Sequence, residues 1–81
     1  MATRRRREQP KRLAGKLLAI RRKLGLSQTQ MAKRLELKKA YTVISSYERG
    51  MREPDLVILL RYARLGKVSV DTLIDDKAKL F

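Results

Sequence analysis

The sequence predicts an all-α fold, a compact bundle of five short helices. Apolar residues recur three and four positions apart in successive segments, which is the period of amphipathic helices. Residues that begin or end helices separate these segments, and no segment alternates polar and apolar residues as a half-buried strand does. With 81 residues, the chain is long enough for one small domain and leaves little room for a large catalytic cavity.

The first two helices are predicted from their stripes and their ends. The first should follow Pro10 and end at Gly25, since glycine is common just past a helix end. Its apolar residues lie four, three and four positions apart: Leu13, Leu17, Ile20 and Leu24. Ser27 can cap the second helix, and Gln30, three positions on, can complete a capping box. The inward face of this second helix is expected to hold Met31, Ala32 and Leu35.

Three more helices are predicted in the second half of the chain. Ile44 and Tyr47, three positions apart, indicate a short third helix that ends near Gly50. Pro54 and Asp55 are suited to open a fourth helix. Its expected stripe, followed by its expected stop, is Leu56, Leu59, Leu60, Ala63 and Gly66. The residues expected to cap and fill a fifth helix are Ser69, Val70, Leu73 and Ile74.

The charge of the chain is strongly positive and unevenly placed. There are 21 Lys and Arg against 8 Asp and Glu, a formal charge of +13, and residues 1–39 carry +12 of it. This charge favours a polyanionic partner, nucleic acid before an anionic membrane surface. Residues 1–10 are predicted to be a disordered basic arm that contacts phosphates or a minor groove, the alternative being a solvated tail. The arginines of this arm are Arg4, Arg5, Arg6 and Arg7.

Composition and spacing exclude several functions. The chain has no Cys and no His, so it lacks thiolate and imidazole metal ligands and the usual base of catalytic triads. Asp75 and Asp76 are adjacent in sequence with no His or Cys nearby and are expected to serve helix-end solvation and solubility, and no glycine-rich phosphate loop is present. The longest apolar run, 56–60, is far shorter than the roughly 20 residues that cross a bilayer. We therefore expect no enzymatic activity, cofactor, metal or membrane partner, and a cytoplasmic, nucleoid-associated protein.

Two short consecutive helices joined by a turn, within a small basic domain, meet the requirements of a helix-turn-helix. The chain carries, in this order, Gly25-Leu26-Ser27-Gln28, Met31-Ala32, Leu35, Ile44-Ser45, Tyr47-Glu48-Arg49-Gly50 and Pro54. In these residues it resembles the Cro and phage-repressor type of helix-turn-helix protein, the XRE family, over about 17–74. The resemblance implies a lambda-repressor-like DNA-binding domain at 11–76, with the helix-turn-helix in helices two and three, and a short tail at 77–81. It also implies a transcriptional regulator, expected to be a repressor, that binds an inverted-repeat operator in double-stranded DNA as a homodimer.

One departure from the family lies between the second and third helices. Ala32 and Glu48 are sixteen positions apart where the family usually has fourteen, so the turn is longer or the recognition helix begins earlier. With the register counted from the end of the third helix, the resemblance gives the base-facing residues Tyr41, Thr42, Ser45 and Ser46. Phosphate contacts are expected from Ser27, Gln28, Lys38, Lys39, Arg49 and Arg52. The family also pairs the positions of Arg21 and Glu48 across the first and third helices.

Several alternatives remain at this stage. Thr42 could instead cap the third helix, Tyr41 could pack beneath the turn, and the charges of the expected ion pair could be unrelated. The dimer contact could come from Val57 and Ile58 or from the chain end at 80–81, and Gly66-Lys67 replaces the family's usual Leu-Gly. The same fold could also serve an antitoxin or restriction-modification controller, with a partner protein in the antitoxin case, or a protein-interaction or RNA-binding module. The small number of aromatic residues, three Tyr and one Phe, argues against base stacking on single strands.

Overall fold

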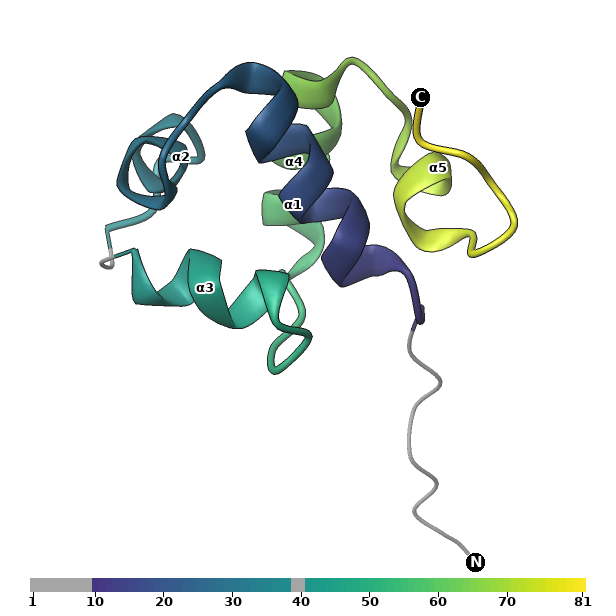
Figure 1. The fold of residues 1–81 in the computed structure, drawn as a ribbon, viewed down its shortest axis with the longest axis horizontal. Coiled ribbons are helices and arrows are strands. Elements are labelled where there is room, and N and C mark those ends of the chain that lie inside the picture. Colours follow the sequence, from purple (N-terminus) through teal and green to yellow (C-terminus); the bar gives the residue numbers. More distant parts are fainter. Residues whose placement is uncertain (1–9, 39–40) are drawn as a thin grey trace, which may run out of the picture.

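The computed structural model describes residues 10–38 and 41–81, and within them the chain is entirely helical apart from its connections. The expected arginine arm and Lys39 therefore lie outside the described residues. The helices are α1 (Leu13–Leu24), α2 (Gln28–Arg34), α3 (Thr42–Glu48), α4 (Leu56–Gly66) and α5 (Val70–Ile74), as Figure 1 shows. This architecture confirms the all-α fold class and the order of helices predicted from the sequence.

The helix ends follow the local signals in the sequence. Gly25 ends α1 in the left-handed region with φ 70°, where a residue without Cβ carries no steric cost. At α2 the Ser27 hydroxyl accepts from the Gln30 amide, and the Gln30 side chain accepts from the Ser27 amide, so the capping box is complete. Asp55 caps α4 and Ser69 caps α5 through the amides three positions on.

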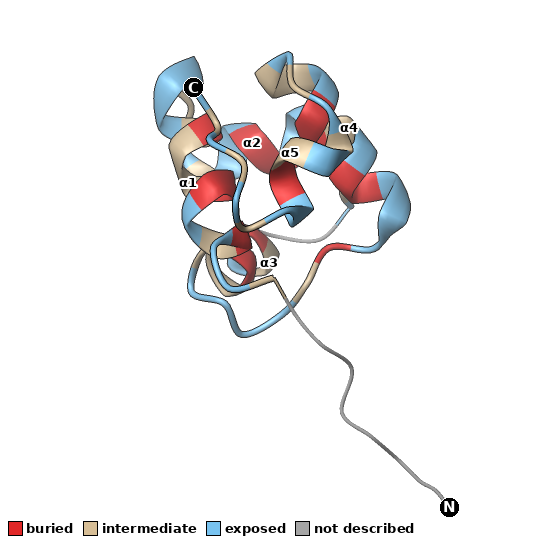
Figure 2. Ribbon diagram, turned by 90° about the vertical axis from the view of Figure 1, so that its right-hand side faces the viewer, coloured by how far each residue is buried: buried red, intermediate tan, exposed pale blue. Residues whose placement is uncertain are grey.

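The core forms around α1, which contacts α3, α4 and α5, while α2 packs on α3. In Figure 1, α2 and α3 lie at one end of the molecule and α5 with the chain end at the other. The inward-facing positions of the helices are the buried ones in Figure 2. The largest fully buried side chains are Tyr62, Leu17, Ile20, Met31, Leu35, Ile44 and Leu73. Because these side chains come from all five helices, the helices share one core.

The predicted stripe of α4 is partly wrong. Leu56 is 80% exposed and Leu60 39% exposed, whereas Ile58 and Tyr62 join Leu59 and Ala63 in the core. The first five residues of α4 are all large and apolar, so a stripe could be drawn along more than one side of the helix. At the end of α1, Leu24 is likewise 36% exposed and only borders the core.

The helix α4 ends near Gly66 as predicted, but the residue with the left-handed backbone is the next one, Lys67. Gly66 is the last helical residue, and the φ of Lys67 is 58°. A Cβ on Gly66 would lie 2.9 Å from Cδ1 of Ile20, a fully buried residue of α1. The glycine is therefore required by the close approach of two helices rather than by its own backbone angles.

The two ends of the described chain are tied together by charged groups. Lys16 of α1 is buried, and its Nζ donates to the carbonyls of Thr72 and Asp75 at the end of α5, at 2.6 and 2.8 Å. In the opposite direction, the Asp76 carboxylate accepts from the amides of Lys11 and Arg12, both at 2.9 Å. The expectation of helix-end solvation and solubility misses the main contact of Asp76, because its carboxylate binds the two amides that precede α1, and these hydrogen bonds lower its pKa.

The last residues of the chain pack back onto α1. Leu80 is half-buried against the core, and Nζ of Lys23 lies 3.9 Å from the ring centroid of Phe81, a cation–π contact. Residues 77–81 thus cover part of α1 in this structure.

Candidate nucleic-acid interface

Residues 35–41 separate α2 from α3, and of these the structure describes 35–38 and 41. The helix α2 ends at Arg34, and α3 begins at Thr42, two residues before Ile44, the first of its buried residues. The helix α3 ends at Glu48, two residues before Gly50.

A polar network fixes α3 to the other helices. Arg21 of α1 binds Glu48 at the end of α3 in a bidentate manner, through Nε at 2.7 Å and Nη2 at 3.1 Å. Its Nη1 also donates to the carbonyl of Leu26 at 2.9 Å. The Glu48 side chain is 5% exposed, and hydrogen bonding to it raises the pKa of Arg21. The two charges are thus paired rather than unrelated.

Gln28 joins this network. Its Nε2 donates to Oε1 of Glu48 at 3.1 Å, so one carboxylate holds the first residue of α2 and the first helix at once. Sequence reasoning assigned Gln28 only to phosphate and missed this contact. Its signal in the sequence is weak, since Gln28 and Glu48 are 20 positions apart.

Two tyrosines lie beneath the network. The rings of Tyr47 and Tyr62 meet edge to face, with centroids 6.4 Å apart and planes at 70°. Tyr62 is fully buried, and among the described residues its hydroxyl has no hydrogen-bond partner. Burial is the main cause that raises the pKa of this phenol.

Of the residues predicted to face bases, Tyr41 and Thr42 lie at the amino end of α3, and Ser45 and Ser46 lie about one turn further on. Tyr41 is the N-cap residue and is 52% exposed, so it does not pack beneath the turn. Thr42 is exposed and makes no capping hydrogen bond, so its alternative role as a cap is wrong. Ser45 and Ser46 are half-buried, and the Ser46 hydroxyl donates to the Thr42 carbonyl at 3.1 Å. The structure brings these four residues together on one short helix.

Some of the residues predicted to bind phosphate already make hydrogen bonds within the protein, and others are exposed basic residues. Ser27 and Gln28 are engaged in the capping box and in the Glu48 contact. Lys38, Arg49 and Arg52 are exposed on either side of α3 in the sequence. Two more exposed basic residues, Lys33 and Arg34, lie in the last turn of α2.

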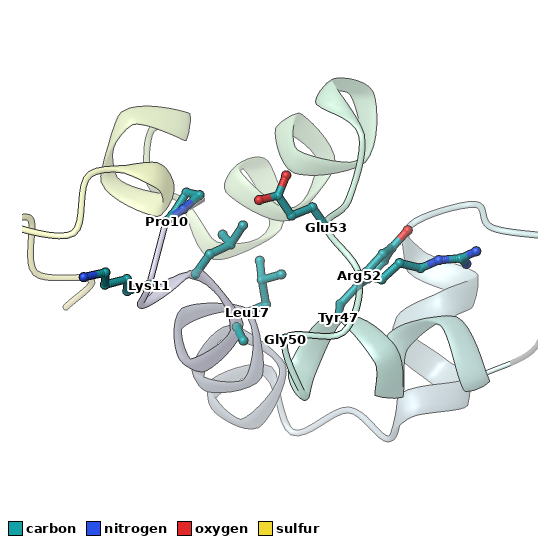
Figure 3. Close-up of a pocket in the computed structure, with 9 residues that line it drawn as sticks. Pro10, Lys11, Leu17, Tyr47, Gly50, Arg52 and Glu53 are labelled. Carbon is teal, nitrogen blue, oxygen red and sulfur yellow. The ribbon is translucent and has the colours of Figure 1, made fainter. Parts of the chain in front are cut away.

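A small cavity lies between the start of α1 and the end of α3, as Figure 3 shows. Its volume is about 290 Å³, and Leu13, Leu17 and Tyr47 contribute to its lining. The side chains of Lys11 and Arg52 extend away from it on opposite sides (Figure 3). In the part of the chain that the structure describes, no group of three or more acidic, His or Cys side chains is arranged to hold a metal. No helix within 10–38 or 41–81 is long and apolar enough to cross a membrane.

The bundle, the two consecutive helices and the exposed amino end of the second define a helix-turn-helix protein. A model of the helix-turn-helix family matches residues 17–73, and the chain belongs to this family, the XRE type that the sequence resembles. The family binds double-stranded DNA, and the chain is accordingly of the DNA-binding, transcription-regulator type. Neither the curated proteins nor the solved structures give a match.

Proposed function

We propose that the protein is a transcriptional repressor that binds a specific operator in double-stranded DNA. The observation that carries this proposal is the exposed amino end of α3, which presents Tyr41 and Thr42 while Glu48, at its other end, is fixed by Arg21 and Gln28. A helix held in this way can enter a major groove without the cost of ordering it first.

Base recognition is assigned to Tyr41 and Thr42 at this end of α3 and to Ser45 and Ser46 about one turn further on. Hydroxyls can donate to or accept from base edges, and the ring of Tyr41 can lie on a thymine methyl. Because the Ser46 hydroxyl already donates to a backbone carbonyl, its remaining role is to accept a hydrogen bond. Short hydroxyl side chains give modest discrimination, at the low end of about 1–3 kcal/mol per base pair.

General affinity is assigned to the basic residues around α3. Lys38, Lys39, Arg49 and Arg52, together with Ser27 and Gln28 at the start of α2, would contact phosphates, and the arm arginines, Arg4–Arg7, would add to them. If about 5–8 phosphates are neutralised per subunit, log K falls with log salt with a slope of about −0.9 per contact. A protein of this kind acts without enzymatic chemistry, in the cytoplasm with the nucleoid.

A homodimer is proposed through the exposed face of α4. Leu56 and Val57 are 80% and 55% exposed, and Leu60, one turn on from Leu56, is 39% exposed. Ile74 of α5, 43% exposed, lines the same surface hollow as Leu56 and extends the apolar patch. Ile58, considered beside Val57 from the sequence, is buried and cannot supply the contact. The chain end is a weaker candidate because it packs on α1.

The proposal is tested by selecting bound sequences from a random duplex library. We expect an inverted repeat whose half-sites lie about 34 Å apart, one helical turn. Absence of any enriched sequence, or a higher affinity for single-stranded RNA than for duplex DNA in a competition assay, would contradict it. For the dimer, Leu56→Glu should remove cooperative binding to the paired half-sites, so that the pair is bound no more tightly than a single half-site, while Phe81→Glu should keep the cooperative binding. The reverse result would move the interface to the chain end.

A further inference from the structure

The carboxyl end of α2 has an unusual backbone. The Glu36 amide donates to the Lys33 carbonyl at 3.0 Å, and the Leu37 amide donates to the Ala32 carbonyl at 2.9 Å. These two hydrogen bonds form a Schellman motif, whose left-handed position is normally glycine. Here that position is Glu36, with φ 59°. A side chain at this angle carries a steric cost, so the turn is less stable on its own than a glycine turn would be.

Arg61, in the middle of α4, contacts the chain at and just before this strained residue. Its Nη1 donates to the carbonyl of Leu35 at 2.8 Å, across 26 positions of sequence. Its Nη2 lies 4.0 Å from Oε1 of Glu36. Leu35 is fully buried and Arg61 half-buried, so the hydrogen bond is partly shielded from water. One guanidinium therefore binds the carbonyl of Leu35, the residue that follows α2, and lies near Glu36, the residue with the left-handed backbone.

We infer that Arg61 is a positioning residue for operator recognition. Ala32 and Glu48 are two positions farther apart than the family usually has, and a longer connection by itself restricts the following helix less. Arg61 fixes the point at which the chain leaves α2, and the residues that follow this point lead to Tyr41 at the start of α3. The inference rests on the proposed function, and it assigns Arg61 no contact with DNA.

The test compares Arg61→Gln with Arg64→Gln. Both arginines are on α4, both variants lose one positive charge, and Arg64 is exposed. The assay is competition between the duplex selected by the wild type and a scrambled duplex, well below each melting temperature. Arg61→Gln should narrow the affinity ratio by about three- to tenfold, the effect of one lost hydrogen bond, and Arg64→Gln should leave it unchanged.

A rescue separates positioning from general loss of stability. Glycine adopts the left-handed conformation without strain. The double variant Glu36→Gly with Arg61→Gln should therefore regain most of the wild-type affinity ratio between the selected and the scrambled duplex. Arg61→Lys, which keeps a positively charged hydrogen-bond donor, should retain part of the wild-type affinity ratio. In amide NMR spectra, Arg61→Gln should shift the signals of Leu37 and Thr42, and Arg64→Gln should not.

Two results would overturn the inference. One is an unchanged affinity ratio in Arg61→Gln, including the case in which both duplexes lose affinity equally, and the other is a double variant whose ratio shows no recovery. If the wild type itself prefers no duplex, the proposed function fails and the inference fails with it. If the wild type discriminates and Arg61→Gln discriminates equally well, only the inference fails.

Discussion

Removal of the Glu48 side chain should destabilise the fold strongly. Glu48→Ala deletes the acceptor of three hydrogen bonds, two from Arg21 at 2.7 and 3.1 Å and one from Gln28 at 3.1 Å. The carboxylate is 5% exposed, so water does not replace these bonds while the protein stays folded. The guanidinium that remains is 17% exposed and keeps its hydrogen bond to the Leu26 carbonyl.

The magnitude follows from this partial compensation. Loss of one partner of a fully buried ion pair costs about 3–5 kcal/mol, and the remaining exposure of Arg21 lowers the expected cost to about 2–3 kcal/mol. For a domain of this size, that corresponds to a fall in melting temperature of about 10–20 °C. Urea and thermal unfolding followed by far-ultraviolet circular dichroism measure both quantities.

Two comparisons make this result specific. Arg52→Ala removes an exposed charge beyond the end of α3 and should change the free energy of unfolding by less than about 0.5 kcal/mol. The double variant Arg21→Met with Glu48→Leu should be more stable than Glu48→Ala, because it leaves no uncompensated charge. Equal, small effects of Glu48→Ala and Arg52→Ala would refute the reasoning and make the ion pair a surface contact without structural weight.

Four further predictions concern the core, the chain ends and the arm. Tyr62→Phe should raise the free energy of unfolding by up to about 1 kcal/mol in urea titrations, since the lost hydroxyl is buried without a hydrogen-bond partner among the described residues. Burial raises the pKa of Tyr62, so wild-type stability should fall as pH rises above about 10, and this variant should lose less of it. The pKa of Asp76 is lowered, so the stability supplied by its carboxylate is complete above about pH 4 and is lost on further acidification. Asp76→Asn should therefore melt lower at pH 7 and show a flatter acid limb in melting scans. Gly66→Ala should cost about 1–3 kcal/mol in the same unfolding assays, because the new methyl meets fully buried Ile20 at 2.9 Å. Deletion of residues 1–9 should weaken binding to every duplex and reduce its salt dependence, with little change in melting temperature.

The sequence predicts the helix ends well because their causes are local. Gly25 acts through its own backbone angles, and the hydroxyl or carboxylate caps at Ser27, Asp55 and Ser69 bind amides three positions away. The helical period likewise identifies most of the core. It fails at the start of α4, where consecutive apolar residues fit more than one face and packing against α1 and α5 decides between them.

Contacts between distant parts of the chain could not be predicted. Asp76 caps α1 from 65 positions away, and Lys16 binds the Thr72 carbonyl across 56 positions. Neither a lone acidic residue nor a lysine on a helix indicates such a partner in sequence. The Arg21–Glu48 pair was predicted only because the family resemblance placed both residues. The same resemblance supplied the register of Tyr41 and Thr42, whose contacts with DNA stay a prediction.

The central claim is that residues at the amino end of α3 and about one turn further on determine sequence preference. The most direct measurement is the affinity ratio between the selected duplex and a scrambled duplex for Thr42→Ala, Ser46→Ala and, as a charge control, Lys38→Ala. We expect both hydroxyl deletions to narrow the ratio by about three- to tenfold and Lys38→Ala to lower both affinities in proportion. An unchanged ratio in Thr42→Ala and Ser46→Ala, with a narrowed one in Lys38→Ala, would contradict the account and place base recognition in the turn.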